Sequence, residues 1–329
     1  MDWLRLIRWK NLLIVFFTQL LVWYCLIDYP GDLLVGVTLF DFLPVGASTV
    51  LIAAAGYIIN DYFDIKIDII NRPEKVVIAK LIPLRAAIIA HVLLNLLALA
   101  LVYPLATRHG HPEWMLVQAV CIVLLWFYST HFKRQLLTGN IVVSILAALT
   151  VLVLQVYKPE LQGVTKVPVL RQAIPAEWIL FGYAFFAFML TWMRETVKDM
   201  EDVKGDADQG CKTLPITMGL EFTAQFVRVL GAFTLLILGI ASIFVFKRGY
   251  VYLGFYTTLG VILPLLWLTF TLGKVNTTAY FAIASRWLKI IMIAGICSLI
   301  VYHFSNNYTL ETNSTGFPVA PQKAAHGNG

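Results

Sequence analysis

The chain has 329 residues, of which 59% are hydrophobic and only 13% are charged, and its formal net charge is +6. An average globular domain carries about 25% charged residues, so this chain has too few polar side chains to cover a surface that faces water. The mean hydropathy of +0.78 agrees with this reading. Composition therefore excludes a secreted soluble domain, a nucleic-acid-binding module and a disordered chain, and it predicts a polytopic membrane protein.

Nine apolar runs follow one another along the chain, each near the length of about 17–25 residues that a helix needs to cross a bilayer. In chain order they lie near residues 12–28, 40–60, 83–106, 114–132, 138–157, 177–197, 222–246, 250–272 and 285–305. We therefore expect an all-α membrane domain over residues 1–305 with nine transmembrane helices. Residues 306–329 are rich in Asn, Thr, Pro and Gly, which predicts a disordered C-terminal tail.

Positive charge is distributed unevenly between the two ends of these runs. With nine spans, the N-terminus and every second join share one side of the membrane, and only seven of the 25 Lys and Arg residues fall on the other. Those seven are Arg108, Lys158, Lys166, Arg171, Lys247, Arg248 and Lys323. Because Lys and Arg accumulate in cytoplasmic loops, we expect the N-terminus in the cytoplasm, the C-terminus on the opposite side, and the protein in the cell (inner) membrane.

Carboxylates are concentrated in two short segments, residues 61–74 and 195–208, on the predicted cytoplasmic side. In the first, Asn60, Asp64 and Asp68 are spaced four residues apart, which places their side chains on one face if the helix continues. Like charges at this spacing destabilise a helix, and a position near the hydrocarbon boundary adds to the cost. A hard divalent cation would offset both effects, and Mg²⁺ suits such oxygen ligands better than Ca²⁺.

The second acidic segment repeats this spacing and adds cations. Asp202 and Asp206 are four residues apart, and Asp199 lies three residues before Asp202. Arg194 and Lys198 precede them by one or two helical turns. Carboxylates that hold metal ions, next to Lys and Arg side chains, suit a diphosphate, whose oxygens need both. The alternative from another class is the acidic mouth of a divalent-cation transporter or channel, although the predicted far side has no matching acidic ring.

The segment NDYFDIKIDIINRPEK, which begins at Asn60, resembles the first Asp-rich motif of the UbiA prenyltransferase superfamily. The segment KDMEDVKGDADQGCKTLPITMG, which begins at Lys198, resembles the second motif, and YSTHFKRQLLTGN is similar to a segment between the two. The resemblance covers essentially the whole membrane region and implies nine helices around a central cavity. After NRP the chain departs from the family's usual continuation, so the roles of residues 74–80 stay open.

The resemblance also implies an Mg²⁺-dependent transfer of a prenyl group from a polyprenyl diphosphate. The residues expected to hold Mg²⁺ are Asn60, Asp64, Asp68, Asp202 and Asp206. Those expected to bind the diphosphate or the acceptor's phosphate are Arg72, Lys133, Arg134, Arg194, Lys198 and Lys212. The expected catalytic residues are Asp64, Asp199, Asp202 and Lys198, with Asp199 as a candidate acceptor of a hydroxyl proton.

The form RExxKDxEDxxGD, from Arg194 to Asp206, is most similar to geranylgeranylglycerol-phosphate geranylgeranyltransferases within the superfamily. That similarity implies geranylgeranyl diphosphate as the donor and the hydroxyl of a prenylglycerol phosphate as the acceptor, in ether-lipid synthesis. An aromatic quinone precursor or a tetrapyrrole is the alternative acceptor. The expected partners are therefore a prenyl diphosphate, a lipid-like acceptor and the bilayer.

Overall fold

The structure is a computed structural model that describes residues 2–27, 39–71, 73–157, 176–274 and 277–314. Within these ranges the chain forms helices and no β-strand, which confirms the all-α class. The helices are α1 (Asp2–Leu6), α2 (Trp9–Val22), α3 (Leu39–Phe63), α4 (Ile65–Asn71), α5 (Leu84–Arg108), α6 (Met115–Thr130), α7 (Thr138–Val156), α8 (Ala176–Asp208), α9 (Leu214–Met218), α10 (Leu220–Lys247), α11 (Val251–Thr257), α12 (Leu263–Thr271) and α13 (Thr278–Ser314).

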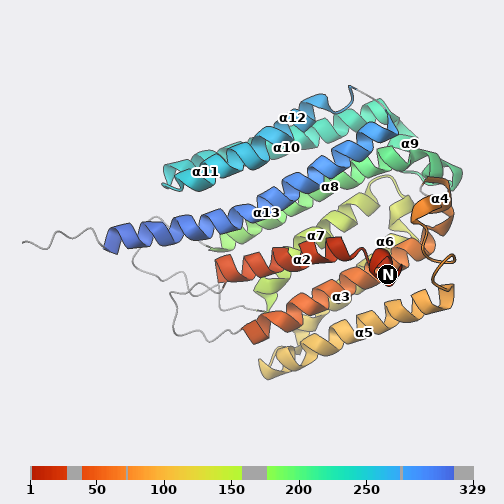
Figure 1. The fold of residues 1–329 in the computed structure, drawn as a ribbon, viewed down its shortest axis with the longest axis horizontal. Coiled ribbons are helices and arrows are strands. Elements are labelled where there is room, and N and C mark those ends of the chain that lie inside the picture. Colours follow the sequence, from red (N-terminus) through yellow and green to blue (C-terminus); the bar gives the residue numbers. More distant parts are fainter. Residues whose placement is uncertain (1, 28–38, 72, 158–175, 275–276, 315–329) are drawn as a thin grey trace, which may run out of the picture.

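Eight helical segments in the described ranges are long and apolar enough to cross a membrane. One of them joins α11 to α12 through a π-helical turn at Thr258–Ile262. The predicted span 177–197 lies within the 33-residue helix α8, which falls outside those eight and carries Arg194, Glu195 and Lys198. Figure 1 shows α8 running along the other long helices, so the predicted span corresponds to a helix of the bundle. The chain is a multi-pass membrane protein.

The long helices lie side by side, and the short helices α4 and α9 lie together at one end of the bundle, as does the N-terminus (Figure 1). Helix α8 occupies a central position because it packs against α7, α10 and α13. The two acidic segments are the end of α3 with α4, and the C-terminal part of α8. The topology therefore brings both segments to the same end of the molecule.

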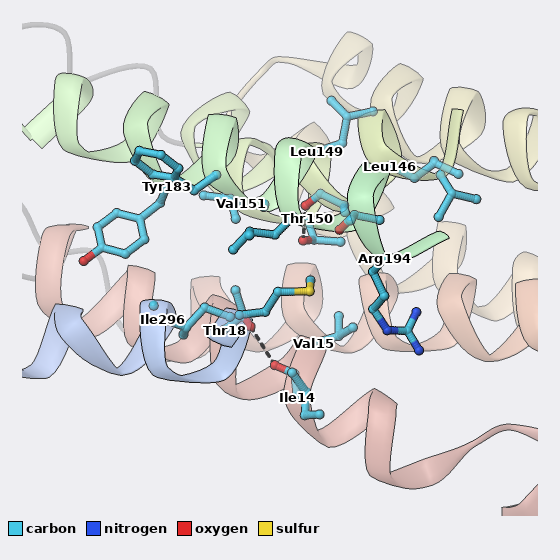
Figure 2. A pocket seen from close by; sticks show the side chains of 18 of the residues that line it. Ile14, Val15, Thr18, Leu146, Leu149, Thr150, Val151, Tyr183, Arg194 and Ile296 are labelled. Atoms are coloured by element: carbon cyan, nitrogen blue, oxygen red, sulfur yellow. Dashed lines mark hydrogen bonds between the residues drawn. The ribbon is translucent and has the colours of Figure 1, made fainter. Parts of the chain in front are cut away.

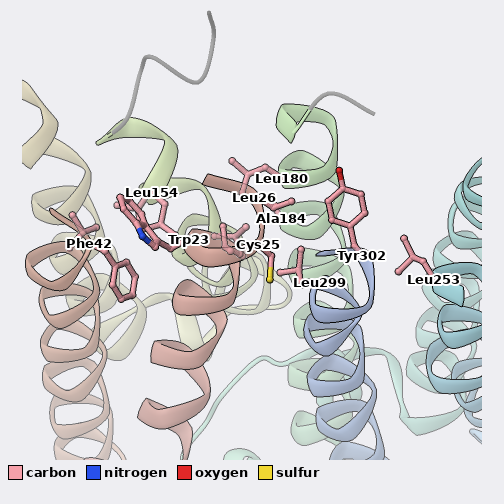
Figure 3. Close-up of a cluster of buried hydrophobic side chains, with 14 of the residues drawn as sticks. Trp23, Cys25, Leu26, Phe42, Leu154, Leu180, Ala184, Leu253, Leu299 and Tyr302 are labelled. Carbon is pink, nitrogen blue, oxygen red and sulfur yellow. The ribbon is translucent and has the colours of Figure 1, made fainter. Parts of the chain in front are cut away.

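A cluster of buried apolar side chains closes the opposite end of the bundle. Trp23, Phe42, Leu154, Leu180 and Leu299 come from five different segments and pack together there, as Figure 3 shows. Many large apolar side chains point outward instead, and Trp178 and Tyr252 are 71% and 70% exposed. An outer surface of this kind is stable in lipid and not in water.

Two boundaries differ from the expectation. Helix α13 begins at Thr278, before the predicted run at 285–305, and continues to Ser314, past the predicted end of the membrane domain at residue 305. Hydropathy marks only the apolar part of a helix, whereas the backbone hydrogen bonds continue into the flanking polar residues. The rest of the predicted tail, residues 315–329, lies outside the described residues.

Candidate active site

A cavity of about 670 Å³ runs between the long helices. Its body is apolar and is lined by side chains such as Ile14, Val15, Leu146 and Leu149, which Figure 2 shows facing the space from opposite walls. Its polar lining at the α4 end consists of Arg8, Asn11, Asn60, Asp64, Asp68, Lys133, Arg194, Glu195, Lys198, Asp202 and Lys289. One end of the cavity is therefore charged, and the remainder suits a hydrocarbon chain.

The first acidic motif lies where α3 passes into α4. Asp64 occupies the break between the two helices and is only 4% exposed. The Asn60 side-chain amide donates a 2.7 Å hydrogen bond to Asp64 Oδ2, and Lys133 Nζ forms an ion pair with the same oxygen. Backbone bonds from Asp64 N to Asn60 O and from Asp68 N to Asp64 O keep the helical spacing across the break. The predicted alignment of these three side chains on one face is therefore preserved.

The carboxylates of this motif are crowded. Burial raises the pKa of Asp68 to about 6, and the negative charges of Asp64 and Asp61 add to the shift. In contrast, Asp61 has its own cation, because Arg8 Nη2 lies 2.6 Å from Asp61 Oδ1. The Oδ1 atom of Asn60 is buried without a hydrogen-bond partner. An unpartnered amide oxygen beside crowded carboxylates is a donor set that a divalent cation would satisfy.

The second acidic motif lies on the C-terminal part of α8. Asp202 lines the cavity, and Asp206 is only 5% exposed. Burial raises the pKa of Asp206 to about 6; the positive charge of Lys133 opposes this shift, while Asp202 and Asp64 contribute to it. Asp206, Asp64 and Lys133 therefore lie close enough for the charges of the two motifs to act on one another. Lys133 is thus the cation that the two motifs share.

Asn71 joins the two motifs directly. Its side-chain Nδ2 donates to the carbonyl oxygen of Asp202 at 3.1 Å, and its Oδ1 accepts from the backbone N–H of Gly205 at 2.9 Å. This close approach needs glycine, because a Cβ at residue 205 would lie 2.5 Å from Asn71 Nδ2. The Asn of NRP and the Gly of the second motif therefore fix α4 against α8.

The turn Phe132–Arg134 places the basic residues between the motifs. Its close contact with the start of α7 depends on Gly139, where a Cβ would lie 2.8 Å from Lys133 Cα. The backbone N–H of Lys212 donates to the carbonyl of Arg134 at 2.8 Å, so both residues lie at this end of the molecule. Their side chains are exposed and do not line the cavity. Arg72 lies outside the described residues.

Arg194, Lys198 and Glu195 form a further charged group on α8. Arg194 Nη1 and Lys198 Nζ both pair with Glu195, the second at 3.0 Å. All three line the cavity. Asp199 faces a different direction: its Oδ2 accepts a 2.8 Å hydrogen bond from Asn140 of α7, and Asp199 is not among the cavity-lining residues. The expected role of Asp199 as a proton acceptor stays a prediction.

Four residues of the charged end of the cavity were not among the site residues expected from the sequence: Arg8, Asn11, Glu195 and Lys289. A lone lysine within an apolar run, such as Lys289, indicates a functional site, because a charge at membrane depth is costly without a function. Glu195 is the first carboxylate of the second acidic segment, residues 195–208, but the residue spacing alone does not predict its partners.

No group of three or more His, Cys, Asp or Glu side chains in the described ranges is arranged to hold a metal ion by itself. Mg²⁺ does not require such a group when phosphate is present, since it binds through one or two carboxylates together with substrate phosphates and water. Asn60 and Asp64 on one motif and Asp202 on the other fit that mode, because all three line the same cavity.

Comparisons with known proteins show what this chain is similar to. The model of the UbiA prenyltransferase family matches residues 28–293. Digeranylgeranylglyceryl phosphate synthase of Methanothermobacter thermautotrophicus is 36% identical over 205 residues, which are 62% of this chain and 64% of that protein. The enzyme of the same name from Ignicoccus hospitalis is 31% identical over 255 residues, which are 78% of this chain and 79% of that protein.

Solved structures show the same fold. A structure concerning digeranylgeranylglyceryl phosphate synthase in membranes has a TM-score of 0.61 at 23% identity, and covers 92% of this chain and 97% of its own. A UbiA homolog from Archaeoglobus fulgidus bound to GPP and Mg²⁺ has a TM-score of 0.55 at 17% identity, and covers 91% of this chain and 100% of its own.

Proposed function

Because the chain belongs to the UbiA prenyltransferase family, we propose that it transfers a geranylgeranyl group from its diphosphate to the free hydroxyl of a prenylglycerol phosphate. The observation that carries this proposal is the shape and polarity of the cavity. Both acidic motifs and Lys133 line one end, and the body is apolar. A prenyl diphosphate has the same division between a charged head and a hydrocarbon tail. The names of the similar curated proteins support the choice of acceptor.

In the proposed reaction the allylic C–O bond of the donor breaks, an ether C–O bond forms to the acceptor, and diphosphate and one proton leave. Mg²⁺, when bound, supplies positive charge that stabilises the departing diphosphate. Asn60, Asp64 and Asp68 would hold one ion and Asp202 with Asp206 the other. Lys133 and Lys198 contribute fixed positive charge next to the diphosphate, where it is worth most in a site that excludes water.

The apolar body of the cavity has a second role in this reaction. Carbon–oxygen bond cleavage leaves an electron-deficient allylic carbon that water would capture. Apolar side chains of that body, such as Ile52, Val143 and Leu190, offer no nucleophile and help to exclude water. Lys198 directly, and Asp202 through a bound cation, would hold the leaving group at the charged end, away from this region.

We also propose that the charged end of the cavity faces the cytoplasm and that the protein lies in the cell membrane. The support is the distribution of Lys and Arg: 18 of the 25 residues lie on the side of the N-terminus, where the joins that follow the second, fourth and sixth apolar runs flank the site. A transport function is not favoured, because the carboxylates that line the cavity, Asp64, Asp68, Glu195 and Asp202, are confined to one end.

The proposal is tested with purified protein, Mg²⁺, labelled geranylgeranyl diphosphate and a panel of acceptors, with products identified by mass spectrometry. The expected product is the diether of a glycerol phosphate. Asp64→Asn and Asp202→Asn are each expected to reduce turnover about 100-fold or more, since each weakens the binding of a cation that would stabilise the departing diphosphate. Asp208→Asn, at the exposed end of α8, is the matched control and is expected to keep wild-type turnover.

Two results would count against the assignment. Full turnover by Asp64→Asn and Asp202→Asn in correctly folded protein contradicts the role of the acidic motifs. A product with an aromatic or tetrapyrrole acceptor, and none with a prenylglycerol phosphate, contradicts the proposed acceptor but leaves the prenyltransferase chemistry intact.

A further inference from the structure

A second group of polar side chains lines the cavity where α2, α8 and α13 face one another. Lys289 of α13 donates a 2.5 Å hydrogen bond from Nζ to Oδ1 of Asn11 on α2. Arg194 of α8 lines the same cavity, and Figure 2 shows its guanidinium reaching into the space from the α8 wall. Three helices that are distant in sequence thus direct donors into one region.

The described residues balance only part of the positive charge of this group. Arg194 and Lys10 are the charged groups that act on Lys289, and both have the same sign as Lys289. In the described part of the chain no carboxylate pairs with Lys289, whose hydrogen-bond partner is a neutral amide. The guanidinium of Arg194 pairs with Glu195 through Nη1, but its Nε is buried without a partner. Converging cations with a spare donor favour a bound anion.

This group lies near the metal-binding motifs but is separate from them. On α8, Arg194 precedes Lys198 by four residues and Asp202 by eight, or about 6 Å and 12 Å along the helix axis. It therefore lies deeper in the bundle than Asp202. Lys133 and Lys198 remain available for the diphosphate, because neither contacts Asn11 or Lys289 through a hydrogen bond in the described ranges.

The proposed acceptor requires such a second position. In a prenylglycerol phosphate the reacting hydroxyl and the phosphate are on adjacent carbons, so the phosphate must lie a few bonds away from the allylic carbon. Two anions cannot share the same cations without strong repulsion. We propose that Lys289, Asn11 and Arg194 form an anion subsite that binds the phosphate of the lipid acceptor. This inference rests on the proposed function and assigns its acceptor specificity to particular side chains.

The test compares two acceptors, geranylgeranylglyceryl phosphate and the same lipid without phosphate. Lys289→Gln is expected to raise the KM for the phosphorylated acceptor about tenfold or more, which corresponds to the loss of one charge-assisted contact. The kcat and the KM for geranylgeranyl diphosphate are expected to stay within about twofold, as are the constants for the acceptor without phosphate. Lys289→Arg is expected to restore most of the affinity.

The matched control is Arg286→Gln, which removes the same charge from an exposed position one turn earlier on α13. A similar rise in KM for Arg286→Gln would mean that general surface charge, and not the subsite, attracts the acceptor. A rise in the KM for geranylgeranyl diphosphate in Lys289→Gln, or an unchanged KM for the phosphorylated acceptor, overturns the inference.

Equilibrium binding of geranylgeranylglyceryl phosphate to the purified protein separates this inference from the proposed function. If the wild-type chain binds this lipid without converting it, and Lys289→Gln binds it about tenfold more weakly, then the subsite stands and the transfer reaction is wrong. If both proteins bind it equally while the wild type forms product, the reaction stands and the subsite is wrong. Absence of binding to the wild type contradicts both.

Discussion

Lys133 is the side chain on which the two acidic motifs depend. It forms an ion pair with Asp64 of the first motif, and its charge also acts on Asp206 of the second. Without substrate, one lysine partly neutralises carboxylates from two helices. In the proposed reaction, a cation held by these carboxylates would supply the neutralising charge, and Lys133 would then be able to contact phosphate oxygens.

The first prediction follows from this exchange of partners. Lys133→Gln is expected to raise the KM for geranylgeranyl diphosphate about tenfold or more, because one charged contact to the diphosphate is lost. Steady-state kinetics with a saturating acceptor measure the effect. Lys204→Gln, an exposed position on α8 outside the cavity, provides the control. An equal KM in both variants would show that Lys133 serves the folded structure and does not bind the donor.

At the residue scale, the sequence predicted which side chains of the acidic motifs lie together, while their roles stay predictions. Asn60, Asp64, Asp68 and Asp202 all line the cavity, as their spacing and order suggested. Lys289 was missed because spacing shows which residues share a face of one helix, but does not show which faces of distant helices meet. Only the packing of α13 against α2 brings Lys289 to Asn11.

Among the elements, the contact between α4 and α8 determines the geometry of the site. Asn71 bonds to the backbone on both sides of the α8 turn that contains Asp202 and Gly205. The helix break at Asp64 precedes this contact and directs α4 toward α8. The sequence pattern did not predict this helix break, because the four-residue spacing of Asn60, Asp64 and Asp68 continues through it.

A prediction at the element scale concerns Gly205. In Gly205→Ala the new methyl group would displace the Asn71 side chain and break both of its hydrogen bonds. We expect the free energy of unfolding to fall by about 1–3 kcal/mol and turnover to fall by more than tenfold. Thermal unfolding in detergent and the product assay measure the two effects.

Gly239→Ala in α10 is the matched control, since a Cβ there meets no atom within 4 Å. Alanine has the better helix propensity, by about 1 kcal/mol, so this variant is expected to be as stable as wild type or more so. A Gly205→Ala protein with wild-type stability and turnover would show that the contact between α4 and α8 tolerates a shift.

Over the whole molecule, the number and order of the spans were predictable because a bilayer imposes one length on every crossing helix. The central position of α8 was not, because hydropathy does not report which helices pack together. Its charged C-terminal half follows from that position: Arg194, Glu195 and Lys198 face a cavity and not lipid. Helix α8 is less apolar than the eight candidate membrane spans because it carries these charged residues of the site.

The orientation of the molecule gives a further prediction. In a background without the four native cysteines, Glu74→Cys lies at the charged end of the cavity and Lys247→Cys at the far end of α10, and both positions are exposed. A membrane-impermeant maleimide added to intact spheroplasts is expected to label residue 247 and not residue 74. Inside-out vesicles serve as the control and are expected to give the reverse. The opposite pattern would place the site on the outer face.

The confinement of charge to one end of the cavity has a consequence for how the reaction ends. Diphosphate carries no hydrocarbon and departs into the aqueous phase, whereas an alkylated glycerol lipid partitions into the bilayer. The two products are therefore separated by solubility as soon as they are released. Reversal of the proposed reaction would require the lipid ether from the bilayer and the diphosphate from the water phase to enter the cavity together, so the partitioning of the products disfavours the reverse reaction.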